Sequence, residues 1–264
     1  MKYFASVSTV VLTSSLRSVI RSRSKETLTS LSLLDFLCGL ELCMCGFELG
    51  VILDIYDTPV YCIYLWIVLV WQGLAWGGAT PSPHTHLVNW WAGQQSLLVT
   101  GARTIAGASG ALSSFTLMSI LWTYDMSHFH EDREKQTSAG HCGDDLQVSL
   151  TMGMIIEMAG SLVCFLSASI MSDIPQLSSK PLLSLSLDSV LGVGLVMAGF
   201  DLTGGYYSPA LALGTKLGCG EAGHAQHLAV YWAAPCVGAL LADPLYQTTK
   251  YIIHKLSGQS KKNV

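Results

Sequence analysis

The distribution of charge along this 264-residue chain restricts the folds that it can adopt. No Asp, Glu, Lys or Arg occurs between Asp57 and Arg103, and none occurs between Arg103 and Asp125. A helix that crosses a bilayer needs about 20 apolar residues, so several spans are available. With 50% hydrophobic and 12% charged residues, the composition is too apolar for an ordinary soluble domain. The sequence therefore predicts an all-α membrane protein; a soluble protein with long buried helices is the alternative.

Two short motifs interrupt the apolar chain in the same way. The stretches "GGATPSPHTHL" (77–87) and "GGYYSPALAL" (204–213) contain the only two Ser-Pro pairs, which begin at Ser82 and Ser208. Serine is favoured at a helix N-cap and proline at the first helical position, and the preceding glycines allow a sharp turn. The apolar run after each motif is too short to span a bilayer. Each motif therefore predicts a re-entrant half-helix.

The same order of features occurs twice in the chain. Asp35 precedes the first Ser-Pro serine by 47 residues, and Glu157 precedes the second by 51. The Gly-Ala-Leu at Gly110 follows the first serine by 28 residues, and the one at Gly238 follows the second by 30. Each copy would hold three spans, so the second inserts upside down relative to the first. Inverted repeats with broken segments at matching positions indicate a transport site near the membrane midplane.

The expected architecture follows from this repeat. Six spanning helices are expected over residues 31–53, 60–77, 103–123, 147–171, 182–200 and 227–254. The expected parts of the chain are an apolar and basic N-terminal segment (1–30), a channel domain (31–255) made of repeat one (31–123), a loop (124–146) and repeat two (147–255), and a tail (256–264). The first 25 residues read as a membrane-surface or anchoring helix, and a cleaved signal peptide is the alternative.

Charge also predicts the orientation in the membrane. Basic residues gather near both termini, at Arg17, Arg21, Arg23 and Lys25 and at Lys255, Lys261 and Lys262, whereas the loop 124–146 carries more acid than base. Lys and Arg favour the cytosolic side, so both termini are expected in the cytosol and the loop on the far side. The net charge is −4 without a basic face, which argues against nucleic-acid binding.

The half-helices suggest a mechanism of selection. A helix that begins inside a membrane has free N–H groups and a partial positive charge at that end. Two such ends meeting tip to tip would repel cations and protons at the waist of a pore, and the hydroxyls of Ser82 and Ser208 could hydrogen-bond water or a polyol. Asp35 and Glu157 cost about 2.5–3.5 kcal/mol each at a helix centre. We expect both to accept hydrogen bonds from the two turns, and snorkelling near a helix end is the alternative.

At these residues the chain resembles the aquaporins, over about residues 31–255. The stretch "TGGYYSPALAL" is similar to the second Asn-Pro-Ala box of that family, with Ser208, Pro209 and Ala210 at the box positions. The stretch "GGATPSPHTHL" is similar to the first box, which here is Ser82, Pro83 and His84. Serine thus stands for asparagine in both boxes. The resemblance implies six spans plus two re-entrant half-helices.

Further segments resemble one branch of the family. "VYWAAPCVGALLA" is similar to the sixth aquaporin helix, with Trp232, Pro235 and Gly238 in structural positions. "ELCMCGFELG", the "PALAL" after the second box and Cys219, nine residues beyond Ala210, resemble the superaquaporins. This unorthodox, mostly intracellular branch contains aquaporins eleven and twelve. The resemblance implies a structural role for Cys219, with redox sensitivity as the alternative.

The resemblance also implies a selectivity filter. Its four positions fall on Cys62, Val196, Gly205 and Leu211, with a register error of about one residue at Cys62. The family usually carries an arginine where this chain has Leu211, so the filter lacks a cation. Such a constriction should be wider and more apolar, and should pass glycerol or hydrogen peroxide as well as water.

The resemblance implies a passive channel without a cofactor or enzymatic activity, assembled as a homotetramer in an intracellular membrane such as the endoplasmic reticulum. A closed or poorly conducting protein with an organellar role is one alternative. An intramembrane metal enzyme using His84 and His86 is another, but residues two apart do not share a helix face, so we predict no metal site. Cys142 and Cys219 are the only cysteines expected in far-side loops, and the sequence leaves a disulfide between them open.

Overall fold

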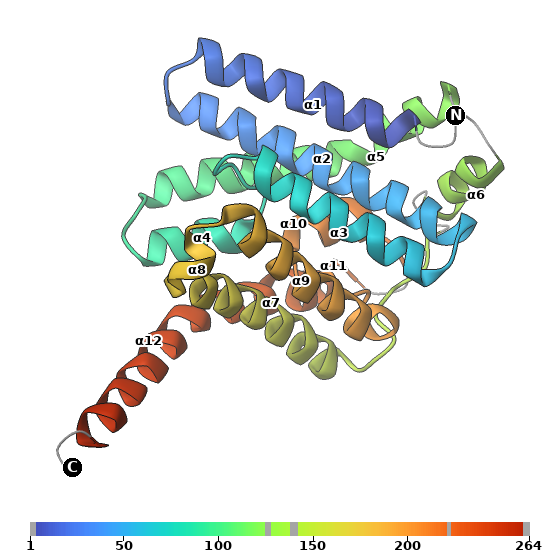
Figure 1. Cartoon of the computed structure of the whole chain (residues 1–264). Helices are drawn as coiled ribbons and strands as arrows, with labels where there is room; N and C mark the ends of the chain where they lie inside the picture. Colours follow the sequence, from blue (N-terminus) through green and yellow to red (C-terminus); the bar gives the residue numbers. More distant parts are fainter. Residues whose placement is uncertain (1–3, 125–127, 138–141, 221–222, 261–264) are drawn as a thin grey trace.

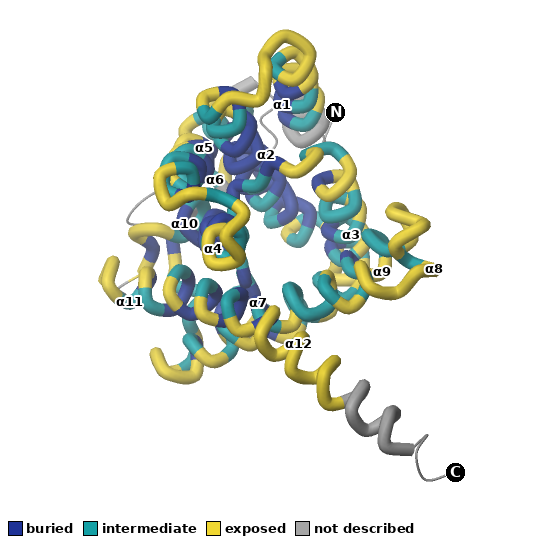
Figure 2. The backbone as a smooth tube through the Cα atoms, turned by 90° about the vertical axis from the view of Figure 1, so that its left-hand side faces the viewer, coloured by how far each residue is buried: buried dark blue, intermediate teal, exposed yellow. Residues whose placement is uncertain are grey.

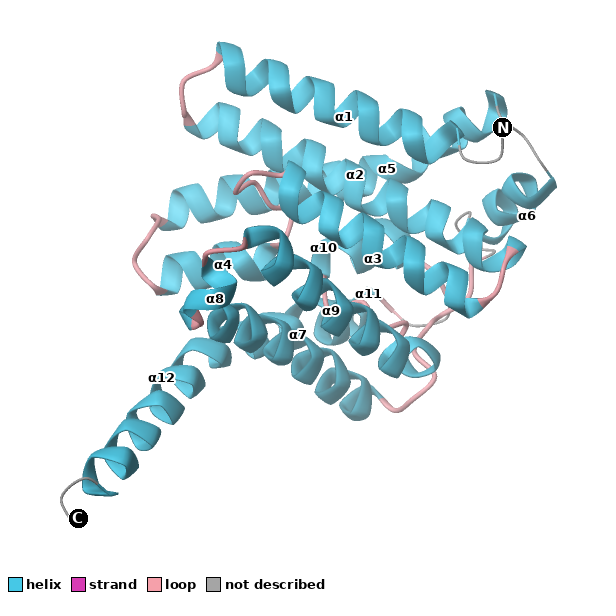
Figure 3. Ribbon diagram, in the orientation of Figure 1, coloured by secondary structure: helices cyan, strands magenta, loops and turns pink. Residues whose placement is uncertain are grey.

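A computed structural model describes residues 4–124, 128–137, 142–220 and 223–260, and this part of the chain contains helices and loops without a strand (Figures 1 and 3). The helices are α1 (Phe4–Arg23), α2 (Leu28–Ile55), α3 (Thr58–Ala75), α4 (Pro83–Trp91), α5 (Leu97–Tyr124), α6 (His128–Thr137), α7 (Leu150–Asp173), α8 (Pro175–Ser178), α9 (Pro181–Thr203), α10 (Pro209–Lys216), α11 (His224–Leu228) and α12 (Ala234–Ser260). A π-helical turn over Ala229–Ala233 joins α11 to α12.

Six helical segments are long and apolar enough to cross a membrane. They are α2, α3, α5, α7, α9 and the continuous run from α11 into α12. Each corresponds to one of the six predicted spans, and α4 and α10 are the two short helices that follow the Ser-Pro motifs. The predicted fold class is therefore confirmed. The protein is a multi-pass integral membrane protein.

Some of the predicted boundaries differ from the observed ones. Helix α5 begins at Leu97 and not at 103, because Ser96 precedes it and accepts a hydrogen bond from the backbone N–H of Val99 (3.4 Å). The last helix continues to Ser260, into the predicted tail. Residues 125–127 and 138–141 of the predicted loop and 261–264 of the tail lie outside the described residues.

The two repeats pack in the same way. Helix α5 packs along α2 in the first repeat, and α12 packs along α7 in the second. A Cβ atom at Gly110 would lie 2.0 Å from the carbonyl oxygen of Phe36, and one at Gly238 would lie 2.2 Å from that of Met158. Phe36 directly follows Asp35, and Met158 directly follows Glu157. The third helix of each repeat thus crosses the first at the same point, and only glycine permits that approach.

Helix α1 lies along α2, to which a short loop connects it (Figure 1). Arg17 donates a hydrogen bond to the carboxylate of Glu41 (2.5 Å), and both side chains are buried. Thr13 and the indole of Trp76 also donate to this carboxylate, while Arg21 donates to the carbonyl of Ala75 at the end of α3 (3.2 Å). The expected surface or anchoring helix is therefore part of the packed bundle. Arg17, assigned from the sequence to a cytosolic basic cluster, is an interior charge paired as burial requires.

Burial differs strongly among the spans (Figure 2). In the most apolar stretch of 18 residues in α2, 72% of the residues are buried. The buried share of the equivalent stretch is 17% in α3, 17% in α7 and 11% in α9. Helix α2 is covered by α1, α3, α5 and α10. Large exposed side chains on the outer faces are apolar, including Ile63, Ile67, Ile105, Ile155, Val190 and Leu241. An apolar exterior of this kind suits a lipid environment.

Gly110→Ala should destabilise the protein because its methyl group would collide with the backbone of α2. We expect the free energy of unfolding to fall by about 1–3 kcal/mol, as for overpacking. Gly101→Ala, on the same helix with no atom within 4 Å of the added methyl group, is the control and should be neutral or stabilising, since alanine favours helix. Thermal unfolding in detergent measures both. Equal melting temperatures would show that the crossing of α2 and α5 is not this close.

Candidate channel site

The two half-helices begin at the predicted positions and contact each other. Helix α4 starts at Pro83 after an extended Ser82, and α10 starts at Pro209 after an extended Ser208. The hydroxyl of Ser208 accepts a hydrogen bond from the backbone N–H of Leu211 (3.5 Å). The hydroxyl of Ser82 makes no capping bond. The two serines therefore occupy equivalent positions but only the second caps its helix through the side chain.

Glu157 anchors the turn that leads into α10. Its buried carboxylate accepts hydrogen bonds from the backbone N–H groups of Tyr206 (3.2 Å) and Tyr207 (2.7 Å) and from the hydroxyl of Thr203 (2.7 Å). Tyr207 is the one non-glycine with a positive φ (47°) in the described part of the chain, a conformation that bulky residues rarely adopt. The carboxylate thus stabilises a turn that would otherwise leave N–H groups unpaired inside the membrane.

Asp35 has the equivalent place in the first repeat. Its carboxylate accepts a hydrogen bond from the backbone N–H of Thr80 (2.8 Å), two residues before Ser82. It also accepts two hydrogen bonds from the guanidinium of Arg103 on α5 (2.5 and 3.0 Å). Nε2 of His86 lies 3.1 Å from the carbonyl oxygen of Thr80. Sequence reasoning assigned no role to Arg103, although a single cation between two charge-free stretches was the signal for a buried ion pair.

A cavity of about 360 Å³ lies between α2, α3, α9 and α10. We call the end of the bundle where α2 ends and α3 begins the far side, and the opposite end the near side. The far-side cavity is lined near its mouth by Asp145 and Lys216, and farther along by Ser208 and Gln72. Most of its remaining lining is apolar. The second half-helix therefore borders a cavity that opens toward the far side.

Three of the four predicted filter residues line this cavity, namely Val196, Gly205 and Leu211. Cys62 does not line it, whereas the preceding residue Tyr61 does. Cys62 packs instead in the apolar contact between α2, α3 and α9. On α3 the residue that lines the cavity is therefore one position before the predicted one, within the stated register error, because the two neighbours point to different sides of the helix.

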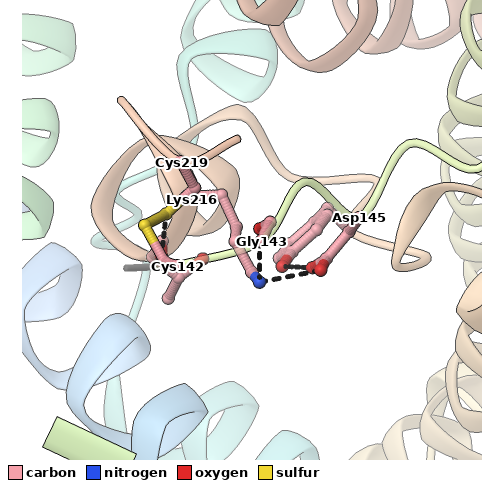
Figure 4. The surroundings of a disulfide bond; sticks show 7 residues. Cys142, Gly143, Asp145, Lys216 and Cys219 are labelled. Atoms are coloured by element: carbon pink, nitrogen blue, oxygen red, sulfur yellow. Dashed lines mark hydrogen bonds and ion pairs between the residues drawn. A yellow bond between two sulfur atoms is a disulfide. The ribbon is translucent and has the colours of Figure 1, made fainter. Parts of the chain in front are cut away.

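A disulfide lies at the far-side mouth (Figure 4). Cys142, before α7, is bonded to Cys219, after α10, which answers the question that the sequence left open and gives Cys219 a structural role. Close by, Lys216 donates a hydrogen bond to Asp145 (2.7 Å), and the hydroxyl of Tyr206 donates to the same carboxylate (2.5 Å). The covalent link joins the loop that carries Asp145 to the end of α10.

A second cavity, of about 440 Å³, lies between α3, α7, α8 and α9. Leu185 and Asp188 of α9 line this near-side cavity, and Val196 and Phe200 line the far-side cavity. These residues share one face of α9 at helical spacing. The two cavities therefore follow one another along the same helix face, as the two halves of a path through the bundle would.

His84 at the start of α4 lies against α7. Its ring packs edge-on against that of Phe165, with centroids 5.1 Å apart. Phe165 is one turn before Ala168, which lines the near-side cavity. The His84 side chain is buried and lines neither of the two cavities. A buried histidine–phenylalanine contact thus lies about one turn of α7 from the lining of the near-side cavity.

The remaining predicted positions lie around this path. His84 contacts Phe165 while His86 faces Thr80, and the described residues contain no group of three metal-ligand side chains. The carbonyl of Pro235 accepts a hydrogen bond from Ser161 of α7 (2.8 Å). Trp232, in the π-helical turn, packs against an apolar cluster that includes Ala212 of α10. The segment from Trp232 to Gly238 thus belongs to the last span, which packs along α7.

Comparison with known proteins agrees with this geometry. Aquaporin-11 of Equus caballus is 30% identical over 212 residues, which cover 79% of this chain and 74% of that protein. The chain belongs to the aquaporin family, in its superaquaporin branch. Human aquaporin-11 is 28% identical over 237 residues (89% of this chain, 84% of that protein), and mouse aquaporin-12 is 23% identical over 239 residues (87% and 80%). No protein-family model matches the chain.

The fold is also found among solved structures. An aquaglyceroporin from Plasmodium falciparum superposes with a TM-score of 0.67 at 16% identity, over 87% of this chain and all of that one. At this identity the likeness concerns the fold alone. The superaquaporin thus shares its fold with a protein of largely different sequence.

Glu157→Gln should destabilise this superaquaporin, because the amide presents one acceptor and a pair of N–H donors where two backbone N–H groups and a hydroxyl now donate to a carboxylate. We expect a loss of about 1–3 kcal/mol in the free energy of unfolding, as for a disrupted buried hydrogen bond. Glu131→Gln, at an exposed side chain of α6, is the matched control. Thermal unfolding in detergent compares the two, and an equal effect would remove the anchoring role from Glu157.

Proposed function

We propose that this superaquaporin is a passive channel for water and small neutral solutes such as glycerol and hydrogen peroxide. The observation that carries the proposal is the contact between two half-helices beside two cavities that follow one face of α9. The N-terminal ends of α4 and α10 bear partial positive charge, which disfavours cations and protons in the path. The box residues Ser82, Pro83, His84, Ser208, Pro209 and Ala210 are proposed to form the waist.

We propose that Tyr61, Val196, Gly205 and Leu211 form the filter on the far side. Lys216 is the cation that lines the far-side cavity, and it is paired with Asp145 at the mouth. A filter without a free cation is less polar than one that presents an arginine. This supports passage of solutes larger than water.

The membrane and assembly are also proposals. By resemblance to its branch, we place the protein in an intracellular membrane such as that of the endoplasmic reticulum, as a homotetramer with residues 31–255 forming the channel domain. The exposed side chains of α1 include Val11, Leu12, Leu16 and Val19, which suits lipid.

Because α1 lies antiparallel along α2, its start and the end of α12 point to opposite ends of the bundle (Figure 1). We therefore keep a cytosolic C-terminus and assign the N-terminus to the far side, which changes the expectation of two cytosolic termini.

One observation favours a second candidate function. His84, a box residue, is buried against Phe165, about one turn of α7 from the lining of the near-side cavity. A path closed at this point would give a poorly conducting protein with a structural role in its organelle.

Purified protein in liposomes should shrink faster than empty liposomes in stopped-flow experiments under a water gradient, and glycerol and peroxide uptake should also rise. His84→Ala separates the two candidates because it shortens the side chain that contacts Phe165. If His84→Ala conducts and the wild type does not, the wild type has a closed resting state. If both proteins match empty liposomes for all three solutes, the channel proposal fails.

Leu211→Arg should narrow the range of solutes, because a cation would enter the apolar part of the far-side cavity. We expect glycerol permeability to fall by about tenfold, the effect of about 1.4 kcal/mol in the barrier, with water affected less. Leu217→Arg is the control, since Leu217 follows α10 and does not line the cavity. Unchanged glycerol passage in Leu211→Arg would show that the filter assignment is wrong.

A further inference from the structure

The polar groups near the far-side mouth hydrogen-bond one another or the backbone. Tyr206 and Lys216 both donate to Asp145 (2.5 and 2.7 Å), and the hydroxyl of Thr215 donates to the carbonyl of Leu211 (2.7 Å). These groups stabilise the mouth and the half-helix. They therefore contribute few free donors to a solute in the cavity.

Gln72 differs from these residues. Its side chain lines the far-side cavity and is only 4% exposed. The amide nitrogen Nε2 is buried and has no hydrogen-bond partner among the described residues. A buried N–H donor that is left unpaired is unfavourable, and native structures pair nearly all such groups. A partner within the cavity would remove this cost.

The position of Gln72 in the path is also distinctive. On α3 the residues that line the far-side cavity run from Tyr61 to Gln72, and the next two residues, Gly73 and Leu74, line the near-side cavity. Gln72 is therefore the last residue along α3 that lines the far-side cavity. A solute that reaches this part of the far-side cavity would meet this side chain.

We propose that the side-chain amide of Gln72 binds the permeating solute and sets the preference of the channel, an inference that rests on the proposed function. An amide offers two N–H donors and a carbonyl acceptor, whereas a serine hydroxyl offers one donor. The ligand class is a small neutral molecule with hydroxyl oxygens, namely water or a polyol such as glycerol. Because the amide carries no charge, it hydrogen-bonds these molecules without holding an ion in the path.

Gln72→Met tests the assignment because methionine has a similar size but no strong hydrogen-bonding group. Gln176→Met is the matched control, since Gln176 is exposed on α8 and lines neither of the two cavities. Gln72→Leu repeats the test if the methionine variant does not fold. Two measurements are made on each protein: the rise in melting temperature that glycerol causes in detergent, and the permeability of liposomes to water and glycerol.

We expect glycerol to raise the melting temperature of the wild type and of Gln176→Met more than that of Gln72→Met. We also expect Gln72→Met to lower glycerol permeability by about fivefold, the effect of one hydrogen bond. Either effect supports the assignment, and equal behaviour of all three proteins in both measurements overturns it. A wild type that does not conduct but shows the Gln72-dependent shift would overturn the channel proposal and leave the binding site. A wild type that conducts, combined with no effect of Gln72→Met in either measurement, would overturn the binding site and leave the channel proposal.

Discussion

The structure depends on one constraint, which is that backbone N–H groups inside a bilayer must be hydrogen-bonded. A chain that turns halfway across the membrane to start a half-helix exposes such groups in the turn. Two buried carboxylates meet this need: Asp35 accepts from Thr80 before α4, and Glu157 accepts from Tyr206 and Tyr207 before α10. Each acid lies on the first helix of its repeat, and the next residue is where the third helix crosses most closely. The half-helix, the acid and the glycine crossing thus form one unit that occurs twice.

The two copies of this unit are supported differently. In the first, Arg103 neutralises Asp35 and the added helix α1 binds Glu41 through Arg17. In the second, Glu157 is bonded only to neutral donors, and the disulfide from Cys142 to Cys219 fixes the loop beyond α10. The second repeat keeps the more regular box, with its serine bonded to its own helix. The first repeat carries His84 and a Ser82 hydroxyl that makes no capping bond. The two ends of the path therefore differ in chemistry although the backbone is repeated.

Much of the fold could be predicted from the sequence. The six spans, the two half-helices and the inverted repeat were all present as patterns of charge, glycine and Ser-Pro. The site was predicted less completely. Val196, Gly205 and Leu211 line the far-side cavity, whereas on α3 Tyr61 lines it and Cys62 does not, because a one-residue register change turns a side chain by about 100° around a helix. The start of α5 was placed too late because residues 97–102 carry no charge and continue the run that follows the first Ser-Pro motif. The sequence therefore does not mark where the helix begins.

The sequence by itself determined which segments enter the membrane and where the chain breaks, because the cost of charge and of unpaired backbone in a bilayer acts on each segment locally. Only the tertiary structure decided which side chains meet. The tertiary structure pairs Arg17 with Glu41, brings His84 against Phe165 and bonds Cys142 to Cys219. It also places the unpaired amide of Gln72 in the wall of the far-side cavity. Such contacts depend on the rotation and crossing of packed helices, which local hydrophobicity does not specify.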